Sequence, residues 1–368
     1  MATAGQVLVG AAAGCLAFVL AHRLLSGRFW LWLLPDLVPP VLYLAGPVVL
    51  LAATPLAWAG GGRWYAVLAT GALAAGAGHS GLNWAALNWA ALNWAALNRA
   101  ALNRAALSRC REPVPLDAVR VVAWNTEYWH QGQPPERFYQ FLRTRRADVY
   151  VLQEYIYGPH RNLLPVHDLG RLRAEFPDHH VAVEGELVTL SRFPIVATPK
   201  VGPARALGPD APWRAVYDLA KVLRTDLRVG PATFSVYNVH IPAQYVRADN
   251  PFAPGFYAEL RDRNARRKAQ LQGLHADIDA NRNALLVTGD LNSTGAMRDI
   301  RGLSRRLASA NRATRRLYPS SWPARGPALW QLDWAFTSGI RVHRYRFLDP
   351  QGFSDHRLQE LLVSVPDH

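Results

Sequence analysis

Polar side chains that could bind a metal ion or move a proton stand at the ends of short apolar runs in the second half of the chain. They are Asn125, Glu154, His240, Asp290, Asn292, Asp333, Asp355 and His356. Hard cations such as Mg²⁺ prefer carboxylate and amide oxygens, and imidazoles suit proton transfer near neutral pH. The two cysteines, Cys15 and Cys110, lack the spacing of a zinc site or of a disulfide framework. If these run ends converge, they form an oxygen-rich Mg²⁺-type site with two imidazoles.

The apolar runs that position these residues have the composition of buried β-strands. They cover residues 120–124, 148–154, 187–191, 194–198, 232–241, 283–290, 331–337 and 358–365, the third and fourth flanking a turn. Helices are predicted between them at 135–147 and 256–280. Many strands with a few helices between them, but without a strict strand–helix alternation, indicate two packed sheets covered by helices, which is an α/β fold. Each polar residue alone would be a turn former or a cap, so the prediction depends on the ordered set.

Seven short motifs, in one order, carry a resemblance to a known family. They are Trp124–Asn125, Leu152–Glu154, Leu190–Ile195, Asn238–His240, Gly289–Asn292, Leu332–Phe336 and Ser354–His356. Over about residues 119–365 the chain resembles the endonuclease/exonuclease/phosphatase superfamily, which includes deoxyribonucleases, abasic-site endonucleases, neutral sphingomyelinases and inositol-polyphosphate phosphatases. The resemblance implies a four-layer α/β sandwich and a metal-dependent phosphoric ester hydrolase.

The resemblance also implies a metal site. Glu154 would be the principal Mg²⁺ ligand, with Asn125 beside it and Asp355 completing the site; Mn²⁺ is the alternative ion. Thr126 and Glu127 stand where relatives often have an apolar residue first, which leaves metal binding intact. The segment after Glu154 lacks the basic residue that some nucleases carry there, which weakens the case for DNA.

The remaining motif residues take catalytic roles in the same resemblance. Asp290 and Asn292 would position the attacking water and contact the phosphate. Asp333 would fix the tautomer of His356 and raise its basicity, while His240 would contact the phosphate or protonate the leaving oxygen. In-line attack at phosphorus needs these functions: an activated water, neutralised phosphoryl oxygens and help for the leaving group.

Charge and composition bound the substrate only loosely. The formal net charge is +14 and the pI about 10.3, which favours an anionic partner, although GC-rich coding also replaces lysine with arginine. We expect hydrolysis of a phosphodiester in nucleic acid or in a phospholipid head group. The alternatives are a phosphomonoesterase for sugar or inositol phosphates and a non-catalytic binding module on the same fold. No protein partner is inferred.

Three apolar stretches in residues 1–80 predict a membrane anchor of two or three helices. They are residues 5–22, 37–59 and 64–78, and the second contains no charge. A signal peptide is the alternative for the first stretch, although it lacks a basic start. The positive-inside rule, applied to Arg23 and Arg28, favours a cytoplasmic catalytic domain, whereas the family resemblance favours the outer face. We expect a multi-pass protein of the cell membrane with an extracytoplasmic catalytic domain.

A repeat and a linker separate the anchor from the catalytic part. Residues 82–109 read LNWAA three times, LNRAA twice and then LSR. A five-residue period makes no stripe on a helix, and so few copies would form little more than one coil of a β-solenoid. An expanded repeat that forms a helical or irregular stalk is favoured. We therefore divide the chain into an anchor at 1–80, a repeat and linker at 81–112 and a catalytic domain at 113–368.

Overall fold

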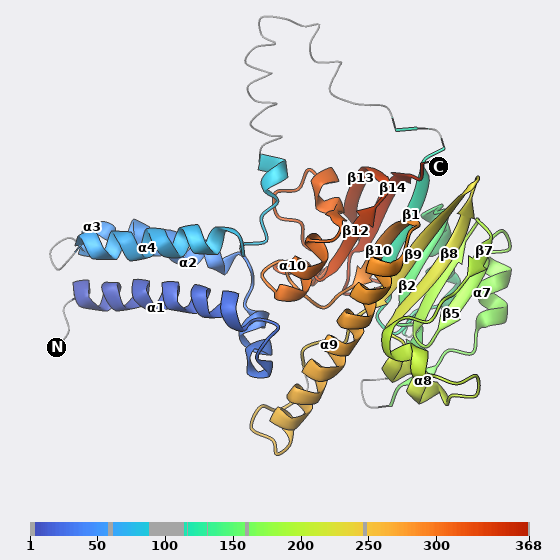
Figure 1. Ribbon diagram of the computed structural model, residues 1–368, viewed down its shortest axis with the longest axis horizontal. Helices are drawn as coiled ribbons and strands as arrows, with labels where there is room; N and C mark the ends of the chain where they lie inside the picture. Colours follow the sequence, from blue (N-terminus) through green and yellow to red (C-terminus); the bar gives the residue numbers. More distant parts are fainter. Residues whose placement is uncertain are drawn as a thin grey trace, which may run out of the picture.

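The computed structural model describes residues 4–57, 62–87, 114–115, 117–130, 132–158, 162–245 and 249–366. Two six-stranded sheets form its centre, in the orders β13-β14-β1-β2-β6-β5 and β11-β12-β10-β9-β8-β7 (Figure 1). The strands are β1 Val119–Asn125, β2 Val149–Gln153, β3 Ile156–Tyr157, β4 Leu164–Pro165, β5 His180–Glu184, β6 Leu187–Ser191, β7 Ile195–Ala197, β8 Val222–Val229, β9 Ala232–His240, β10 Ala284–Asp290, β11 Ala308–Ser309, β12 Asp333–Ser338, β13 Arg341–Leu348 and β14 Leu358–Ser364. The α-helices around the sheets are α6 Pro135–Thr144, α7 Leu169–Glu175, α8 Trp213–Leu219, α9 Phe256–Ala280 and α10 Arg298–Ser304.

Three apolar clusters show how the layers pack. Side chains alternate along β1, so Val121 faces the second sheet while Trp124 faces the helices. Trp124 packs on Phe138 of α6, and the same cluster extends to α7. On the other side, Leu274 of α9 packs against the outer face of the second sheet. The order helices, sheet, sheet, helices confirms the predicted four-layer α/β sandwich.

The predicted strands and long helices are present, with one rearrangement. The predicted helix at 256–280 is α9 with the same bounds. The runs at 187–191 and 194–198, expected to flank a turn, form β6 and β7, which belong to different sheets. Strands β5, β8 and β13 and the two-residue strands were not predicted. Strand β13 carries charged residues because it lies at the edge of its sheet.

The N-terminal residues form a separate helical bundle beside the sandwich (Figure 1). Its helices are α1 Ala4–Leu25, α2 Leu42–Ala52, α3 Thr54–Ala57 and α4 Gly62–Ala77, with 3₁₀ turns η1 Trp30–Leu33 and η2 Pro35–Leu37. Among the described residues, α1 alone is long and apolar enough to cross a membrane as one helix, and a signal sequence would pass the same test.

The structure corrects the expectation for the second apolar stretch. Its described part, residues 37–57, is not one long helix: the chain bends by 63° between η2 and α2, and α2 has 11 residues. Pro39 and Pro40 occupy the break, where proline removes backbone donors and disfavours continued helix. Of the predicted repeat and linker, only residues 81–87 are among those described.

Candidate functional site

Strand register brings three of the predicted residues into one row across the second sheet. Asp290 ends β10 and is paired with His240 of the parallel strand β9 and with Asp333 of the antiparallel strand β12. Asp290 and Asp333 are almost fully buried. Paired residues of neighbouring strands lie side by side, so the pairing of these three strands is what brings the three side chains together.

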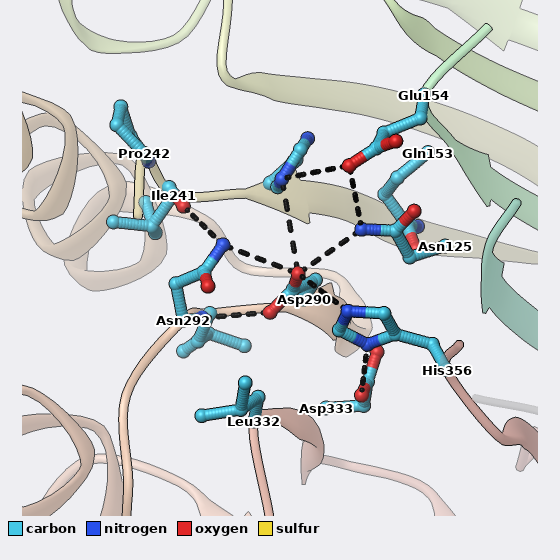
Figure 2. Close-up of polar contacts among 12 residues, drawn as sticks. Asn125, Gln153, Glu154, Ile241, Pro242, Asp290, Asn292, Leu332, Asp333 and His356 are labelled. Atoms are coloured by element: carbon cyan, nitrogen blue, oxygen red, sulfur yellow. Dashed lines mark hydrogen bonds and ion pairs between the residues drawn. The ribbon is translucent and has the colours of Figure 1, made fainter. Parts of the chain in front are cut away.

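The first sheet contributes the facing side chains. Strand β1 ends at Asn125, and Glu154 follows its parallel neighbour β2. The Asn125 Nδ2 group donates to Glu154 Oε1 at 3.1 Å and to Asp290 Oδ2 at 3.1 Å, which joins the two sheets at one edge (Figure 2). Glu154 has φ 61°, a left-handed conformation that is costly for this residue type and is concentrated at functional sites. The Tyr128 amide donates to Glu154 Oε2 at 3.0 Å and so orients the carboxylate.

A tight turn after β10 orients Asp290. The Asn292 amide donates to Asp290 Oδ1 at 2.8 Å, and its side chain donates to Asp290 Oδ2 at 3.1 Å and to the Ile241 carbonyl at 3.0 Å (Figure 2). Gly289 precedes it with φ 137°, and a Cβ atom there would lie 2.1 Å from the Val239 carbonyl oxygen. The motif therefore requires glycine, because any side chain would push β10 away from β9.

His356 and Asp333 form a buried dyad. His356 Nδ1 donates to Asp333 Oδ2 at 2.9 Å, and its Nε2 lies 3.8 Å from Asp290 Oδ2. The indole of Trp124 donates to the His356 carbonyl at 3.0 Å, which ties the histidine to β1. Burial lowers the pKa of His356, but the carboxylates of Asp333 and Asp290 raise it by more than burial lowers it. The pKa of His356 therefore lies well above its usual range.

A second histidine–acid pair was not predicted. His240 Nδ1 lies 3.2 Å from Oε1 of Glu186, a fully buried residue that also forms an ion pair with the buried Lys221. Burial lowers the pKa of His240, but the carboxylates of Glu186, Asp290 and Glu154 together raise it to about 9, with Glu186 contributing most of the rise. Burial raises the pKa of Glu186, while His240 and Lys221 lower it, to about 2. Glu186 lies directly before β6, after a glycine turn, a position without any local signal of chemistry.

The Asp290 carboxylate lies between the two imidazoles. His240 Nε2 and His356 Nε2 are each 3.8 Å from Asp290 Oδ2. Burial and the neighbouring Asp333 raise the pKa of Asp290 to about 6, against the lowering effect of the histidines. A carboxylate with a pKa near neutrality can accept a proton from water at physiological pH.

Asp355 lies at the rim of this group. Its Oδ2 accepts from Trp322 Nε1 at 2.8 Å, and its Oδ1 lies 3.9 Å from His356 Nε2. Its side chain is 44% exposed, whereas the side chain of His356 beside it is 8% exposed. Thus the structure brings seven predicted residues together and places the eighth beside them.

Candidate ligands for a metal ion are present in two neighbouring sets that share no residue. Among the described residues, Asp290, Asp333 and His356 have ligand atoms within 4.8 Å of one another. The predicted set differs, because it consists of Asn125, Glu154 and Asp355. Nδ1 of His356 is already bonded to Asp333, so the carboxylate of Glu154 is the more available oxygen ligand for a hard cation. Asn125 points its Nδ2 group at Glu154, and its Oδ1 accepts from the Glu127 amide at 3.1 Å.

The comparison with known families agrees with this geometry. The sequence profile of the endonuclease/exonuclease/phosphatase family matches residues 122–356. The chain belongs to that family. Family members are metal-dependent phosphoester hydrolases, and this chain is therefore an enzyme of that class.

Similar solved structures are remote in sequence. The family member from Bacteroides vulgatus is 15% identical, covers 68% of this chain and 99% of its own, and has a TM-score of 0.47. The member from Beutenbergia cavernae is 18% identical, covers 67% and 72%, and has a TM-score of 0.45. Sphingomyelinase C from Streptomyces griseocarneus is 17% identical, covers 67% and 99%, and has a TM-score of 0.40. No curated protein matches the chain.

Proposed function

We propose that this enzyme hydrolyses a phosphodiester, in nucleic acid or in a phospholipid head group, by Mg²⁺-assisted attack of water. The observation that carries the proposal is the placement of Asp290 between two histidines that each have an acidic partner. Water attacks phosphorus, one P–O ester bond breaks, and the leaving oxygen takes a proton. The products are a phosphomonoester and an alcohol.

The chain's own residues supply the proton transfers and much of the charge. Asp290, held by Asn292, orients the water and accepts its proton. His356, held cationic by Asp333, neutralises the phosphoryl oxygens. His240, held cationic by Glu186, donates to the leaving oxygen. Preorganised charge of this kind lowers the barrier because it need not reorient during the reaction.

Asn125, Glu154 and Asp355 would hold the metal ion, with Mn²⁺ as the alternative to Mg²⁺. Glu154 and Asp355 offer carboxylate oxygens, which fit a hard cation. Asn125 would offer its Oδ1 after its amide group turns, because its Nδ2 group now donates to Glu154 and Asp290. When bound, the ion would neutralise phosphoryl charge and polarise the phosphoryl oxygen.

The test uses full-length protein in detergent with bis-p-nitrophenyl phosphate, with Mg²⁺ and with EDTA. Asp290→Asn should lower kcat at least ~1000-fold, because it removes the proton acceptor while keeping the shape of the side chain. The matched control is Asp262→Asn, an exposed aspartate of α9, which should leave kcat unchanged. Turnover that survives either EDTA or the Asp290 change would contradict the proposal.

We further propose that residues 1–80 anchor the enzyme in the membrane through α1, with α2 and α4 packed beside it, ahead of the repeat and linker at 81–112 and the catalytic domain at 113–368. The bundle exposes apolar side chains such as Val7, Val49 and Val67. Exposed apolar side chains along several helices suit a lipid environment. Helix α1 packs along α4, and α2 does the same.

We place the catalytic domain on the outer face of the membrane, following the family resemblance. The positive-inside rule, applied to Arg23 and Arg28, favours the cytoplasmic face instead. A cysteine introduced at the exposed Asp262 distinguishes the two. Labelling by a membrane-impermeant maleimide in intact cells should match labelling in lysed cells. Labelling only after lysis would place the domain inside.

A further inference from the structure

The active-site edge of the sandwich is the edge that contacts the helical bundle. His22 Nε2 donates to the carbonyl of Ala296, in the loop that follows Asp290, at 3.0 Å. Trp330 Nε1, in the loop that precedes Asp333, donates to the Leu37 carbonyl at 2.9 Å. The bundle therefore holds two of the loops that adjoin the catalytic residues.

The segment after His240 makes a third contact. It leads into α9, whose first residue, Phe256, packs with Leu33 of η1. The Tyr257 ring lies 6.4 Å from the ring of Trp30, centroid to centroid. Figure 1 shows the short helical segment that follows α1 lying beside α9. Because all three contacts involve buried or packed groups, the orientation of the active-site edge toward the bundle is fixed.

Aromatic and basic side chains gather at this junction, and we call them the collar: Phe29, Trp30, Phe252, Tyr257 and Arg261. Phe252 is 94% exposed, Tyr257 49% and Phe29 43%. The Arg261 guanidinium lies 5.0 Å from the Trp30 ring centroid. Aromatic rings prefer the head-group region of a bilayer, and arginine is attracted to anionic head groups.

Phe252 is held in an ordered turn. The Asn250 side chain accepts from the Phe252 amide at 2.9 Å, and the Ala253 amide donates to the Asn250 carbonyl at 2.9 Å. The large exposed ring thus belongs to a built loop that is joined, through Phe256, to the first turn after α1.

We infer that the collar rests on the bilayer surface and that the active site acts on the phosphodiester of a lipid head group. The inference builds on the proposed phosphodiesterase activity and names its substrate class. The collar is continuous with the anchor, because it begins four residues after the last residue of α1, the apolar helix that could span the membrane. A site held at the surface by three loops meets head groups before it meets soluble polymers. The attacked bond is then the P–O ester of the lipid, and the products are a lipid and a head-group fragment, one of which keeps the phosphate.

The first test compares a lipid with a soluble substrate. Full-length enzyme is placed in nanodiscs of phosphatidylcholine and phosphatidylglycerol, and release of phosphorylated or free head groups is measured beside hydrolysis of bis-p-nitrophenyl phosphate. Phe252→Asp should lower lipid turnover at least ~10-fold, since a charged residue is excluded from the interface, and should leave soluble-diester turnover unchanged. The matched control is Val196→Asp, an exposed position (48%) on β7, at the far side of the sandwich in Figure 1, which should change neither rate.

The outcomes separate this inference from the proposed function. Equal loss on both substrates in the Phe252 variant, or no loss on either, would overturn the collar's role. Plasmid DNA cleaved without lipid hydrolysis would overturn the lipid assignment. Failure of the wild-type enzyme on the soluble diester would instead count against the proposed activity.

A second measurement does not depend on activity. An environment-sensitive NBD probe is attached to a cysteine at position 252 or at position 196 of the full chain, after replacement of Cys15 and Cys110 by serine. In nanodiscs the probe at 252 should shift to shorter wavelength and be quenched by doxyl-labelled lipid, while the probe at 196 should show neither. A solvent-like spectrum at 252 would refute bilayer contact.

Discussion

The pairing of Glu186 with His240 yields a quantitative prediction, because it is the interaction that holds this imidazole cationic. The rise in the pKa of His240 from 6.5 to about 9 corresponds to ~3 kcal/mol in favour of the charged form. Burial opposes that rise, and Glu186 contributes most to it, ahead of Asp290 and Glu154. Glu186→Gln keeps the shape of the side chain and removes the charge, so the pKa of His240 should return to 6.5 or below.

The consequence is a displaced alkaline limb in the pH dependence of kcat/KM. If His240 must be protonated, the wild-type enzyme keeps its activity up to about pH 9, and activity falls as the pH rises through that pKa. In Glu186→Gln the fall begins near pH 6.5. At pH 8 the protonated fraction drops from about 90% to about 3%, an expected loss of about 30-fold, whereas activity at pH 5.5 changes little.

The assay is hydrolysis of bis-p-nitrophenyl phosphate from pH 5 to 10 at constant Mg²⁺. A uniform loss at all pH values would refute the reasoning, because it would indicate structural damage without a change in the pKa of His240. The variant leaves Lys221 buried without its ion pair, so Glu186→Gln combined with Lys221→Met serves as control. The alkaline limb should shift in both variants.

Three further results are expected. Asp333→Asn should lower kcat by ~1000- to 10,000-fold with unchanged near-ultraviolet circular dichroism, because His356 loses the partner of its Nδ1; a loss below tenfold would contradict the dyad. Gly289→Ala should destabilise the fold by at least ~2 kcal/mol, measured by thermal unfolding, because its Cβ would lie 2.1 Å from the Val239 carbonyl oxygen. Glu154→Gln should raise the Mg²⁺ concentration for half-maximal activity ~10-fold or more, and an unchanged titration would remove Glu154 from the metal site.

Local pattern determined much of this protein. Alternation and β-branched composition placed the central strands, and the arginine-rich run at 256–280 is α9 with the same bounds. Polar residues that end buried strands interrupt an apolar pattern, and Asn125, Glu154, His240 and Asp290 became recognisable as an ordered set of such residues. Order along the chain then sufficed to name the family.

Only the tertiary structure determined the contacts between residues that are far apart in the chain. The pairing of Asp290 with both His240 and Asp333 is a matter of strand register between segments far apart in the chain. Glu186 could not be identified because an acidic residue next to the start of a strand has no distinctive neighbours; only folding places it 3.2 Å from His240.

The orientation of the active site toward the helical bundle belongs to the same class of information. Hydrophobicity along a chain reports which residues avoid water, and it marked residues 5–22 and 64–78 as apolar. It does not report which loop of another domain will accept a hydrogen bond from His22. Side-chain chemistry and periodicity are properties of neighbouring residues, and so the sequence determined them. Register, burial and contact between distant segments arise only when the chain is packed, and so only the folded structure decided them.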